Sequence, residues 1–275
     1  MKRAIKKMAI NYLQSKGFHI AKTTPASEVW KVVNLLKPID SGIELIRVGG
    51  DYDGGYLLPD ALAGIKHCFS PGVADVSTFE HDCLERGIVS FLADYSVDAP
   101  PIDLSGCKFT KKYVGALSND EFMSLDEWIT ESLPDDQDSE MILQMDIEGA
   151  EYEALLATAK ATMRRFRIMI LEFHNMESLR DINYFNIVLA TLRKIREDFD
   201  VVHLHPNNCC GISSINGVEI PNIFEVTFLR KDYVKSQKPV KSLPHPLDQA
   251  NLPLMADLGL PEQWAWNEQD RGDVS

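Results

Sequence analysis

Short apolar runs alternate with segments of helical periodicity over most of the chain. Apolar residues recur at helical intervals in 77–86, 125–132, 150–159 and 183–198, which predicts amphipathic helices there. Strands that alternate with helices are joined by right-handed crossovers into a mainly parallel sheet. The pattern therefore predicts an α/β sandwich of three layers around a mostly parallel seven-stranded sheet. The strands are expected at 65–70, 89–93, 108–114, 141–145, 167–173, 201–205 and 224–229.

The first part of the chain, residues 1–60, departs from this alternation. It contains two helical patterns, at 4–16 and 26–36, and two short strand patterns, at 44–47 and 55–58. The strand patterns flank a turn rich in Gly and Asp, residues that favour a tight reversal. We expect these helices and this hairpin to pack on the central domain.

The central domain is expected to span 61–232, followed by an extension of residues 233–275. This extension is rich in Pro, Gln and Asp and carries Trp264 and Trp266. We expect an irregular tail that lies along the surface or over a site, with disorder from about Asn267.

The first predicted helix is basic, and its apolar residues recur at helical intervals. Such a helix either packs on the protein or lies on a membrane surface; we expect packing. Its sequence lacks the uninterrupted apolar run of a signal peptide, and no stretch approaches the roughly 20 apolar residues of a membrane span. We therefore expect no integral membrane segment.

The charge narrows the range of partners. The 275 residues carry a formal net charge of −13, which argues against nucleic acid because binding to phosphates relies on clustered Lys and Arg. The five cysteines are irregularly spaced and match no usual zinc pattern. Free thiols in a reducing cytoplasm are the simpler interpretation. The sequence leaves the oligomeric state open.

Polar residues follow the predicted strands where ligands of open parallel sheets bind. Gly72 lies in the turn after the first strand, where its backbone can approach a ligand closely, although a plain turn explains it equally well. Asp94 follows the second strand, roughly 20 residues downstream. A carboxylate at this point either binds both ribose hydroxyls of a nucleotide or ends a turn.

Three carboxylates, Asp146, Glu148 and Glu151, follow the fourth strand at a predicted helix entrance. They repel one another unless the helix dipole, a cation or a proton compensates. Acidic residues are ordinary in a first helical turn, but their density at a strand end favours a functional role.

Histidines follow the next two strands. Glu172 and His174 lie two residues apart, and so do His203 and His205, so each pair shares one side of an extended segment. Either His174 or His205 can act as a general base, since the pKa of histidine is near neutral. Asp146, Glu172, His174 and His205 can alternatively gather a divalent cation.

Together these residues resemble the FkbM-type family of class I S-adenosylmethionine-dependent methyltransferases. The segment Leu143–Glu151 is similar to the family's lysine–isoleucine–aspartate–valine–glutamate–glycine–alanine–glutamate signature, with Gln144 in the place of the lysine. The likeness continues in Met169–His174 and in the short acidic segment Ser124–Trp128, and it covers roughly 65–230.

The resemblance implies a Rossmann-like fold with S-adenosylmethionine above the first, second and fourth strands. In that arrangement the first turn binds the amino acid part of the cofactor, Asp94 holds the ribose, and the segment from Val114 lies near the adenine. Carried over by position, the cofactor-binding residues are Ser70, Gly72, Asp75, Asp94, Val114, Gly115, Ala116 and Asp146.

Members of the family typically methylate hydroxyl groups of sugars or secondary metabolites. The resemblance therefore implies a small-molecule or glycan acceptor. An upstream segment, 47–56, resembles one in relatives associated with glycan biosynthesis. We expect the acceptor to contact Arg47, Asp51, Tyr56, Glu148 and Asn207.

Methyl transfer from a sulfonium is an in-line displacement, so the protein supplies alignment and a proton acceptor. We expect His174 or His205 to take the proton of the acceptor hydroxyl, with Asp146 and Glu172 as orienting residues. A divalent cation held by Asp146, Glu172 and His205 is a second route, because it lowers the pKa of a hydroxyl. Two rival functions stay open: a metal-dependent hydrolase, and a catalytically silent binding module on the same fold.

Overall fold

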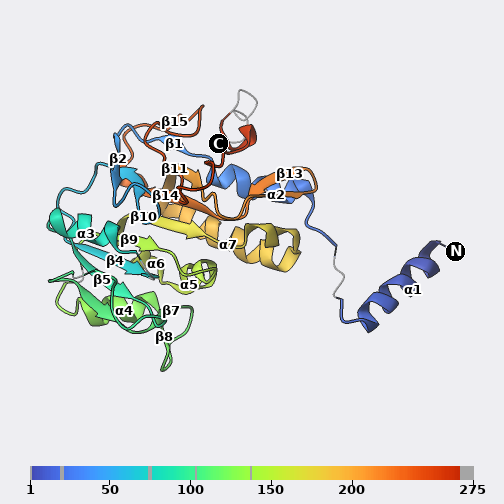
Figure 1. Cartoon of the computed structure of the whole chain (residues 1–275), viewed down its shortest axis with the longest axis horizontal. Helices are drawn as coiled ribbons and strands as arrows, with labels where there is room; N and C mark the ends of the chain where they lie inside the picture. Colours follow the sequence, from blue (N-terminus) through green and yellow to red (C-terminus); the bar gives the residue numbers. More distant parts are fainter. Residues whose placement is uncertain (1, 19–21, 74–75, 103, 137, 267–275) are drawn as a thin grey trace.

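The structure is a computed structural model that describes residues 2–18, 22–73, 76–102, 104–136 and 138–266. Figure 1 shows a twisted central sheet with helices on both of its faces and one helix that lies apart from the rest. The expected α/β sandwich is confirmed, and all seven strands predicted for the central sheet belong to it.

The central sheet has the strand order β11-β14-β10-β9-β4-β5-β6. Strand β14 runs antiparallel to both neighbours, whereas the other neighbouring pairs are parallel. Numbered in chain order, these strands give the spatial order 6-7-5-4-1-2-3. The seven strands are β4 (His67–Pro71), β5 (Val89–Ala93), β6 (Lys108–Thr110), β9 (Met141–Met145), β10 (Phe166–Phe173), β11 (Phe199–Pro206) and β14 (Phe224–Arg230).

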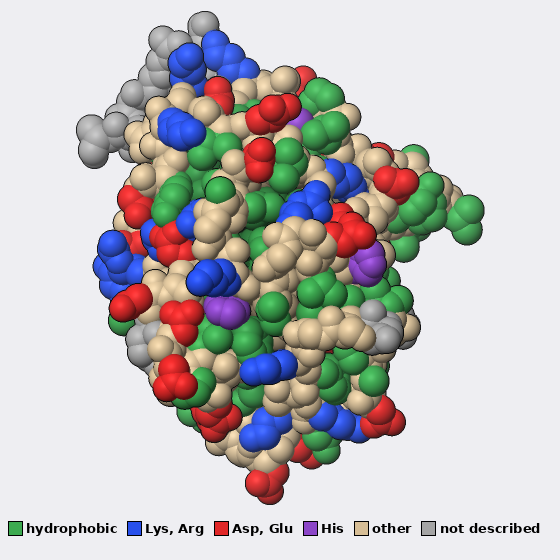
Figure 2. All heavy atoms as spheres, turned by 90° about the vertical axis from the view of Figure 1, so that its left-hand side faces the viewer, with side chains coloured by type: hydrophobic (Ala, Val, Ile, Leu, Met, Phe, Trp, Pro, Cys, Tyr) green, Lys and Arg blue, Asp and Glu red, His purple; other side chains and the backbone are tan. Residues whose placement is uncertain are grey.

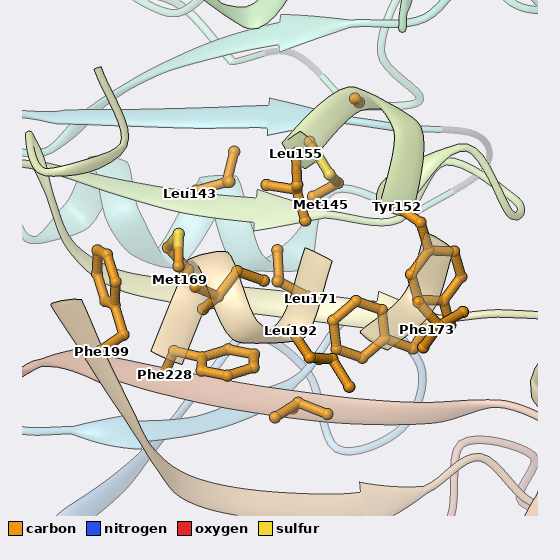
Figure 3. Close-up of a cluster of buried hydrophobic side chains, with 14 of the residues drawn as sticks. Leu143, Met145, Tyr152, Leu155, Met169, Leu171, Phe173, Leu192, Phe199 and Phe228 are labelled. Atoms are coloured by element: carbon orange, nitrogen blue, oxygen red, sulfur yellow. The ribbon is translucent and has the colours of Figure 1, made fainter. Parts of the chain in front are cut away.

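One face of the sheet carries the larger apolar core. Side chains from alternate positions of β9 and β10, such as Leu143, Met145 and Leu171, point towards helices on this face (Figure 3). Tyr152 and Leu192 reach them from two of these helices. The covering helices are α2 (Ala26–Leu36), α4 (Leu125–Ser132), α5 (Glu151–Ala157) and α7 (Ile182–Asp198).

The other face is covered by α3 (Thr78–Glu85) and by the predicted hairpin, formed by β2 (Leu45–Val48) and β3 (Tyr56–Pro59). The hydroxyl of Thr227 on β14 donates to the carbonyl of Leu57 at 2.6 Å, which joins hairpin and sheet. This smaller core leaves room for polar side chains near the carboxyl ends of the strands, as described below.

Three parts of the fold differ from the prediction. The expected strand 108–114 is broken: β6 ends at Thr110, and β7 (Tyr113–Val114) pairs with β8 (Phe122–Met123) in a separate sheet. Between the predicted strands 201–205 and 224–229, where no strand was predicted, the chain forms a hairpin. The strands of this hairpin are β12 (Ile212–Ile215) and β13 (Val218–Pro221). The tail also supplies a short strand, β15 (Lys238–Pro239), which pairs with β1 (Ile39–Asp40).

The described part of the tail packs on the body. Trp264 is fully buried against Phe224, and its indole N–H donates to the carbonyl of Glu219 at 3.0 Å. The disorder expected from Asn267 concerns residues outside the described ones. The remaining short helical elements are α6 (Lys160–Met163), η1 (Met176–Arg180), η2 (Lys231–Tyr233) and η3 (Glu262–Trp264).

Helix α1 (Lys2–Ser15) differs from the expectation of packing. Figure 1 shows it away from the sheet, and its described side chains are exposed or half-buried. Among the described residues, no helix has both the length and the apolar character needed to cross a membrane.

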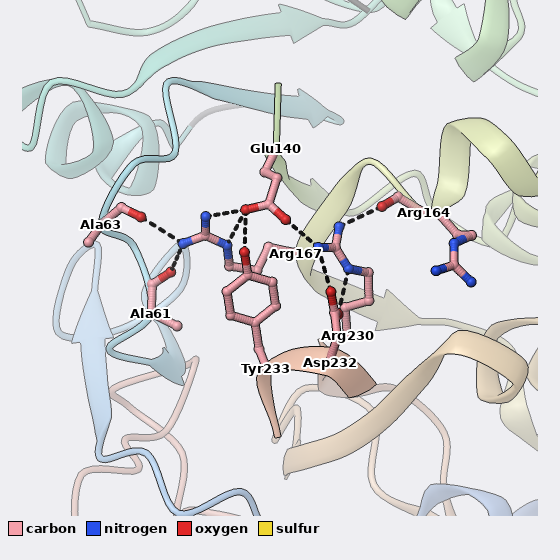
Figure 4. Close-up of polar contacts among 8 residues, drawn as sticks. All are labelled: Ala61, Ala63, Glu140, Arg164, Arg167, Arg230, Asp232 and Tyr233. Carbon is pink, nitrogen blue, oxygen red and sulfur yellow. Dashed lines mark hydrogen bonds and ion pairs between the residues drawn. The ribbon is translucent and has the colours of Figure 1, made fainter. Parts of the chain in front are cut away.

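At the edge of the sheet opposite the carboxyl ends, one carboxylate is surrounded by cations. Glu140, just before β9, contacts the guanidinium groups of Arg167 and Arg230 and accepts from Tyr233 Oη at 2.5 Å (Figure 4). Burial raises the pKa of Glu140, but these hydrogen bonds outweigh it and lower the pKa to about 2. The cluster joins β9, β10 and β14 at their common edge.

Candidate functional site

The order of the central strands reverses between β4 and β9, the point where open α/β sheets bind ligands. Here the two strand ends touch. The backbone N–H of Asp146 donates to the carbonyl of Pro71 at 3.2 Å, and Gly72 has a φ of 89°. A Cβ on Gly72 would lie 1.4 Å from the carbonyl oxygen of Asp146, so only glycine fits this turn.

A cavity of about 180 Å³ opens beside this contact. One wall is the hairpin turn, which the sequence singled out for its Gly and Asp residues, and the opposite wall is formed by the ends of β4 and β9. The lining residues are Asp53, Gly54, Tyr56, Gly72, Val73, Val76, Phe79, Glu80, Gln144 and Asp146.

A hydrogen-bonded chain crosses the floor of the cavity. Ser70 Oγ lies 2.6 Å from Gln144 Oε1, and Gln144 Nε2 donates to Tyr56 Oη at 3.1 Å. Ser70 Oγ also contacts the buried Glu80. A hydroxyl has one proton to donate, and burial raises the pKa of Glu80, so a protonated Glu80 can donate to Ser70 while Ser70 donates to Gln144. Gln144 thus links the sheet to the hairpin.

The loop after β9 presents the acidic segment in an unusual backbone conformation. Glu148 and Gly149 both have positive φ, 56° and 105°. This turn leaves Glu148 exposed and directs Glu151 inwards, where it is fully buried. Glu151 Oε1 accepts from the backbone N–H groups of Ile147 and Gly149, at 3.1 Å each. These donors compensate the charge of Glu151, as the sequence required of this helix entrance.

His174, after β10, lies against this loop. Its Nδ1 is 3.0 Å from Glu151 Oε1, and its Nε2 is 3.6 Å from Asp146 Oδ1 and from Glu148 Oε2. Glu151 therefore orients the imidazole so that Nε2 faces the two carboxylates at the open end of the loop.

Burial and charge act together on these groups. Burial raises the pKa of Asp146 to about 6, and Glu148 adds to the rise while His174 and a hydrogen bond to Glu172 oppose it. For His174, burial lowers the pKa, but the hydrogen bond and charge of Glu151 outweigh it and the pKa is raised. Perturbed groups next to a cavity are typical of functional sites.

A second polar group lies farther along the sheet. In the strand register Glu172 on β10 pairs with Glu225 on β14, and Glu225 pairs with His205 on β11. We call these three residues the polar row. Asn207 Nδ2 donates to Glu172 at 2.8 Å, and Asn251 Nδ2 from the tail donates to Glu225 at 2.6 Å. Burial raises the pKa of Glu225 to about 8, and it raises the pKa of Glu172 as well, so burial disfavours the charged form of both carboxyl groups of the row.

The tail encloses this row. Asp257 Oδ1 lies 3.3 Å from His205 Nε2, and Asp248 Oδ1 lies 2.8 Å from His203 Nε2. His205 is 3% exposed, and burial lowers its pKa. The expectation that His205 stands beside Asp146 is wrong, because β14 and β10 lie between β11 and β9.

The expected cation set is also wrong. Asp146, Glu172 and His205 do not bring ligand atoms within 4.8 Å of one another, whereas Asp146, Glu148 and His174 do. Oxygen and imidazole ligands of this kind suit a divalent cation. Sequence spacing placed Glu172 and His174 together, but the chain leaves the extended conformation after Phe173, and the two side chains take different partners.

The predicted cofactor residues fall into two groups. Gly72 and Asp146 line the cavity, and Ser70 lies behind its wall, hydrogen-bonded to the lining residue Gln144. Asp94 directly follows β5, and its Oδ1 accepts from the backbone N–H and hydroxyl of Ser96. Asp94 is not among the residues that line the cavity. Asp75 lies outside the described residues. Val114, Gly115 and Ala116 follow or end β7, away from the cavity lining, and Gly115 N–H donates to Met123 O at 3.0 Å.

The predicted acceptor residues divide similarly. Tyr56 lines the cavity, but Asp51 is an exposed loop residue, and Asp53 takes the place expected for it. Arg47 uses its guanidinium to hold the hairpin turn, donating to Gly50 O at 2.8 Å and Tyr52 O at 3.0 Å.

Glu148 lies next to His174, as reported above, and Asn207 is bound to Glu172. Sequence reasoning missed Glu80, Glu225 and Asn251. A charged residue inside the predicted strand 224–229 was a signal for Glu225; nothing in the sequence indicated that the distant Asn251 would cover it.

The molecular surface around this region mixes both signs of charge. Figure 2 shows acidic and basic side chains interspersed on the face that includes the hairpin side of the molecule, without a continuous basic band. Such a face lacks the clustered cations that phosphate backbones require.

The comparisons with known proteins agree with the sequence resemblance. Residues 118–199 match the family model described as "Methyltransferase FkbM domain". That segment contains α4, β9, the acidic loop and His174. No curated protein matches the chain.

Solved structures are similar to the chain at low identity. A chain of a fibrillarin/NOP5P complex is 11% identical with a TM-score of 0.38, covering 70% of this chain and all of that one. A putative SAM-dependent methyltransferase from Streptococcus mutans is 11% identical with a TM-score of 0.35, over 62% of this chain and 45% of that one. Magnesium protoporphyrin IX methyltransferase from Synechocystis PCC 6803 is 13% identical with a TM-score of 0.30, over 62% and 76%.

Proposed function

Since residues 118–199 match the FkbM methyltransferase domain, we propose that the chain is an S-adenosylmethionine-dependent O-methyltransferase. Its acceptor is a hydroxyl group of a sugar, glycan or other small molecule. The observation that carries this proposal is the meeting of the matched acidic loop with His174 beside the cavity at the strand crossover.

The cavity fits one end of such a cofactor. Gly72 and Gly54 line the cavity with positive φ, and at both positions a Cβ would collide with neighbouring protein atoms, so glycine is required for this shape of the wall. Acidic and hydroxyl groups, from Asp53, Asp146 and Tyr56, suit the ammonium group of an amino acid moiety. When bound, S-adenosylmethionine supplies a methyl group on a positively charged sulfur, which neighbouring carboxylates stabilise electrostatically.

His174 is the residue we assign as proton acceptor. Among the described residues, the contacts of its Nε2 are those with Asp146 and Glu148, at 3.6 Å each. With S-adenosylmethionine bound, Nε2 would take the proton of the acceptor hydroxyl as the hydroxyl oxygen displaces the sulfur from the methyl carbon. The products are the methyl ether, S-adenosylhomocysteine and a protonated imidazole, so atoms and charge balance.

Glu151 acts through His174. It accepts the hydrogen bond of Nδ1–H, which places the proton of the neutral imidazole on Nδ1, leaves Nε2 as the acceptor, and stabilises the imidazolium formed in the reaction. Because Glu151 is fully buried and held by two backbone N–H groups, it is a fixed positioning residue.

Cofactor binding is the first test. Titration calorimetry with S-adenosylmethionine and S-adenosylhomocysteine should show saturable binding to the wild-type chain. Asp146→Ala should weaken that binding, since Asp146 lines the cavity. Absence of binding to either compound would refute the proposed function.

Proton transfer is the second test. His174→Gln should lower the transfer of labelled methyl groups to saccharide hydroxyls by about 10²- to 10⁴-fold at unchanged cofactor affinity. Glu151→Gln should lower the transfer of methyl groups less than His174→Gln does, because the imidazole of His174 is still present. The matched control is His81→Gln, at an exposed histidine of α3. We expect this substitution to leave methyl transfer unchanged. Equal turnover of the His174 and His81 variants would exclude the assigned base.

A divalent cation is a second candidate at the same place, favoured by the proximity of Asp146, Glu148 and His174 ligand atoms. The two roles of His174 exclude each other, because a nitrogen that binds a metal cannot accept a proton. Calorimetry with Mg²⁺ and Mn²⁺, together with turnover in the presence of a chelator, separates them. Tight metal binding together with turnover that is lost in the presence of a chelator would show that His174 is a metal ligand and not the base. The bound cation would then lower the pKa of the acceptor hydroxyl.

We also propose a reducing cytoplasm as the compartment. Its support is that all five cysteines are free, including the neighbours Cys209 and Cys210 on one loop. Mass spectrometry of the protein alkylated in intact cells should find all five thiols labelled after denaturation.

A further inference from the structure

The first helix is the part of the molecule that the proposed activity does not use. Among the described residues, the contacts of 5–18 are with one another: Ser15 Oγ donates to Tyr12 O at 2.7 Å, and Lys16 lies over the Tyr12 ring. Figure 1 shows α1 apart from the sheet, at the opposite end of the view from α3. A soluble body normally buries the apolar stripe of an amphipathic helix, and here it is open.

The open stripe is large for a helix in water. Ile5, Met8 and Tyr12 are 60%, 72% and 63% exposed, and their spacing of three and four residues places them on one side of the helix. Leu13 and Phe18 are exposed as well. An isolated helix of this length is marginal in water, so it gains most of its stability from whatever covers this side.

The charge identifies the covering surface. Residues 1–25 contain six of the chain's 28 Lys and Arg and no acidic residue; the remaining residues therefore carry 22 basic against 41 acidic residues, a net charge of −19. The described Lys6, Lys7 and Lys16 are exposed. A second copy of this helix would bring like charges together. An anionic bilayer offers both negative charge and an apolar layer at the depth an interfacial helix reaches.

We propose that α1 is a membrane-surface anchor, which lies in the interface of an anionic phospholipid membrane with Ile5, Met8 and Tyr12 inserted and its lysines at the headgroups. The acidic body is repelled by such a surface, so it stays on the aqueous side. The anchor is independent of methyl transfer, since none of its residues belongs to the site.

Vesicle flotation of the full chain tests this proposal. The wild type should bind vesicles of phosphatidylcholine with phosphatidylglycerol, and binding should fall at high salt because exposed charges are screened. It should bind phosphatidylcholine alone much more weakly. Equal binding to both vesicles, or to neither, would overturn the proposal.

Two pairs of substitutions separate charge from apolar insertion. The double substitution Lys6→Glu with Lys7→Glu should weaken vesicle binding by about 25-fold or more. The reason is that each basic residue near the membrane surface strengthens binding by about fivefold. Met8→Ser with Tyr12→Ser keeps the charge and should weaken it by about tenfold or more, since two apolar side chains no longer insert.

The matched control is Lys66→Glu with Lys241→Glu, the same charge change at exposed lysines of the body, and it should leave binding within about twofold of wild type. A loss as large as that of the helix variants would contradict an anchor confined to α1. All variants should keep wild-type cofactor binding and melting temperature, because α1 makes no described contact with the body. Capture of α1 by an acidic protein groove without any lipid binding would also overturn the proposal.

Discussion

At the scale of single residues, Gly72 shows how closely the two strand ends at the crossover approach. Its N–H donates to Ala93 O at 2.9 Å, and its Cα faces the Asp146 carbonyl. The turn brings the end of β4, the end of β5 and the acidic loop together. The cavity wall therefore depends on one residue without a side chain.

Replacing Gly72 by alanine should destabilise the protein by more than about 4 kcal/mol, because the new Cβ would collide with backbone and the left-handed φ is unfavourable. Urea denaturation followed by circular dichroism measures this. The control is Gly87→Ala, which has a φ of 76° but open space around the site, and should cost about 1–2 kcal/mol. Similar losses for both variants would show that the close approach does not matter.

His174 and Glu172 show a second effect at this scale. They are two residues apart, yet His174 contacts Glu151 and Glu172 contacts Asn207. Residue types and strand ends were predictable, whereas the pairing depends on Asn175, whose φ of 57° turns the chain immediately after His174.

At the scale of elements, the cluster around Glu140 links three strands at the edge far from the cavity. Glu140 is three-quarters buried and contacts Arg167 at the start of β10 and Arg230 at the end of β14. Arg167 also donates to Ala61 O and Ala63 O, so the segment after the hairpin is held as well. A buried carboxylate with several charge-assisted hydrogen bonds is among the stronger polar contacts in proteins.

Glu140→Gln should lower the free energy of unfolding by up to about 3 kcal/mol at pH 7, the equivalent of a pKa lowered from 4.5 to about 2. Because the folded-state pKa lies below the ordinary value, the contribution is complete above about pH 4.5 and is lost as the pH falls towards 2. Urea denaturation between pH 7 and pH 3 measures it.

The difference between wild type and Glu140→Gln should therefore shrink on acidification. Glu85→Gln, at an exposed residue at the end of α3, serves as the control and should change stability by less than about 0.5 kcal/mol. A difference that stays constant from pH 7 to pH 3 would contradict the assigned charge effect.

At the scale of the whole molecule, the tail is part of the folded unit. Asn251 and Asp248 cover the polar row and its neighbour His203, and Trp264 fills the core near β14. Trp266 Nε1 donates to Pro38 O at 2.7 Å, which joins the tail to the segment after α2.

Trp264→Ala should cost about 3–5 kcal/mol of unfolding free energy, as expected for the loss of a large, fully buried side chain. Leu254→Ala, in the same tail but 99% exposed, should cost less than about 0.5 kcal/mol. Thermal unfolding monitored by near- and far-UV circular dichroism compares them. If the Trp264 variant melted like the wild type, the tail would be an appendage and not part of the core.

Much of the fold was predictable at this scale because it depends on local periodicity. Alternation of apolar residues with helical segments marked all seven strands of the central sheet. The broken strand after Thr110 and the hairpin β12–β13 were not predicted. The first depends on the pairing of β7 with β8 in a separate sheet. The second depends on the turn at Asn216 and Gly217, two residues with positive φ.

The sequence by itself determined the sheet, the family resemblance and the acidic loop, because periodicity and a contiguous motif are local properties of the chain. Only the tertiary structure decided that His174 stands with Asp146 while His205 is enclosed by the tail. The physical reason is strand order: β10 lies next to β9, but β14 and β10 separate β11 from it, and no local pattern encodes that order. Likewise, only the tertiary structure showed that the apolar side of α1 is exposed. Amphipathic periodicity is the same whether a helix packs on its own body or on a membrane, so the sequence pattern does not distinguish the two.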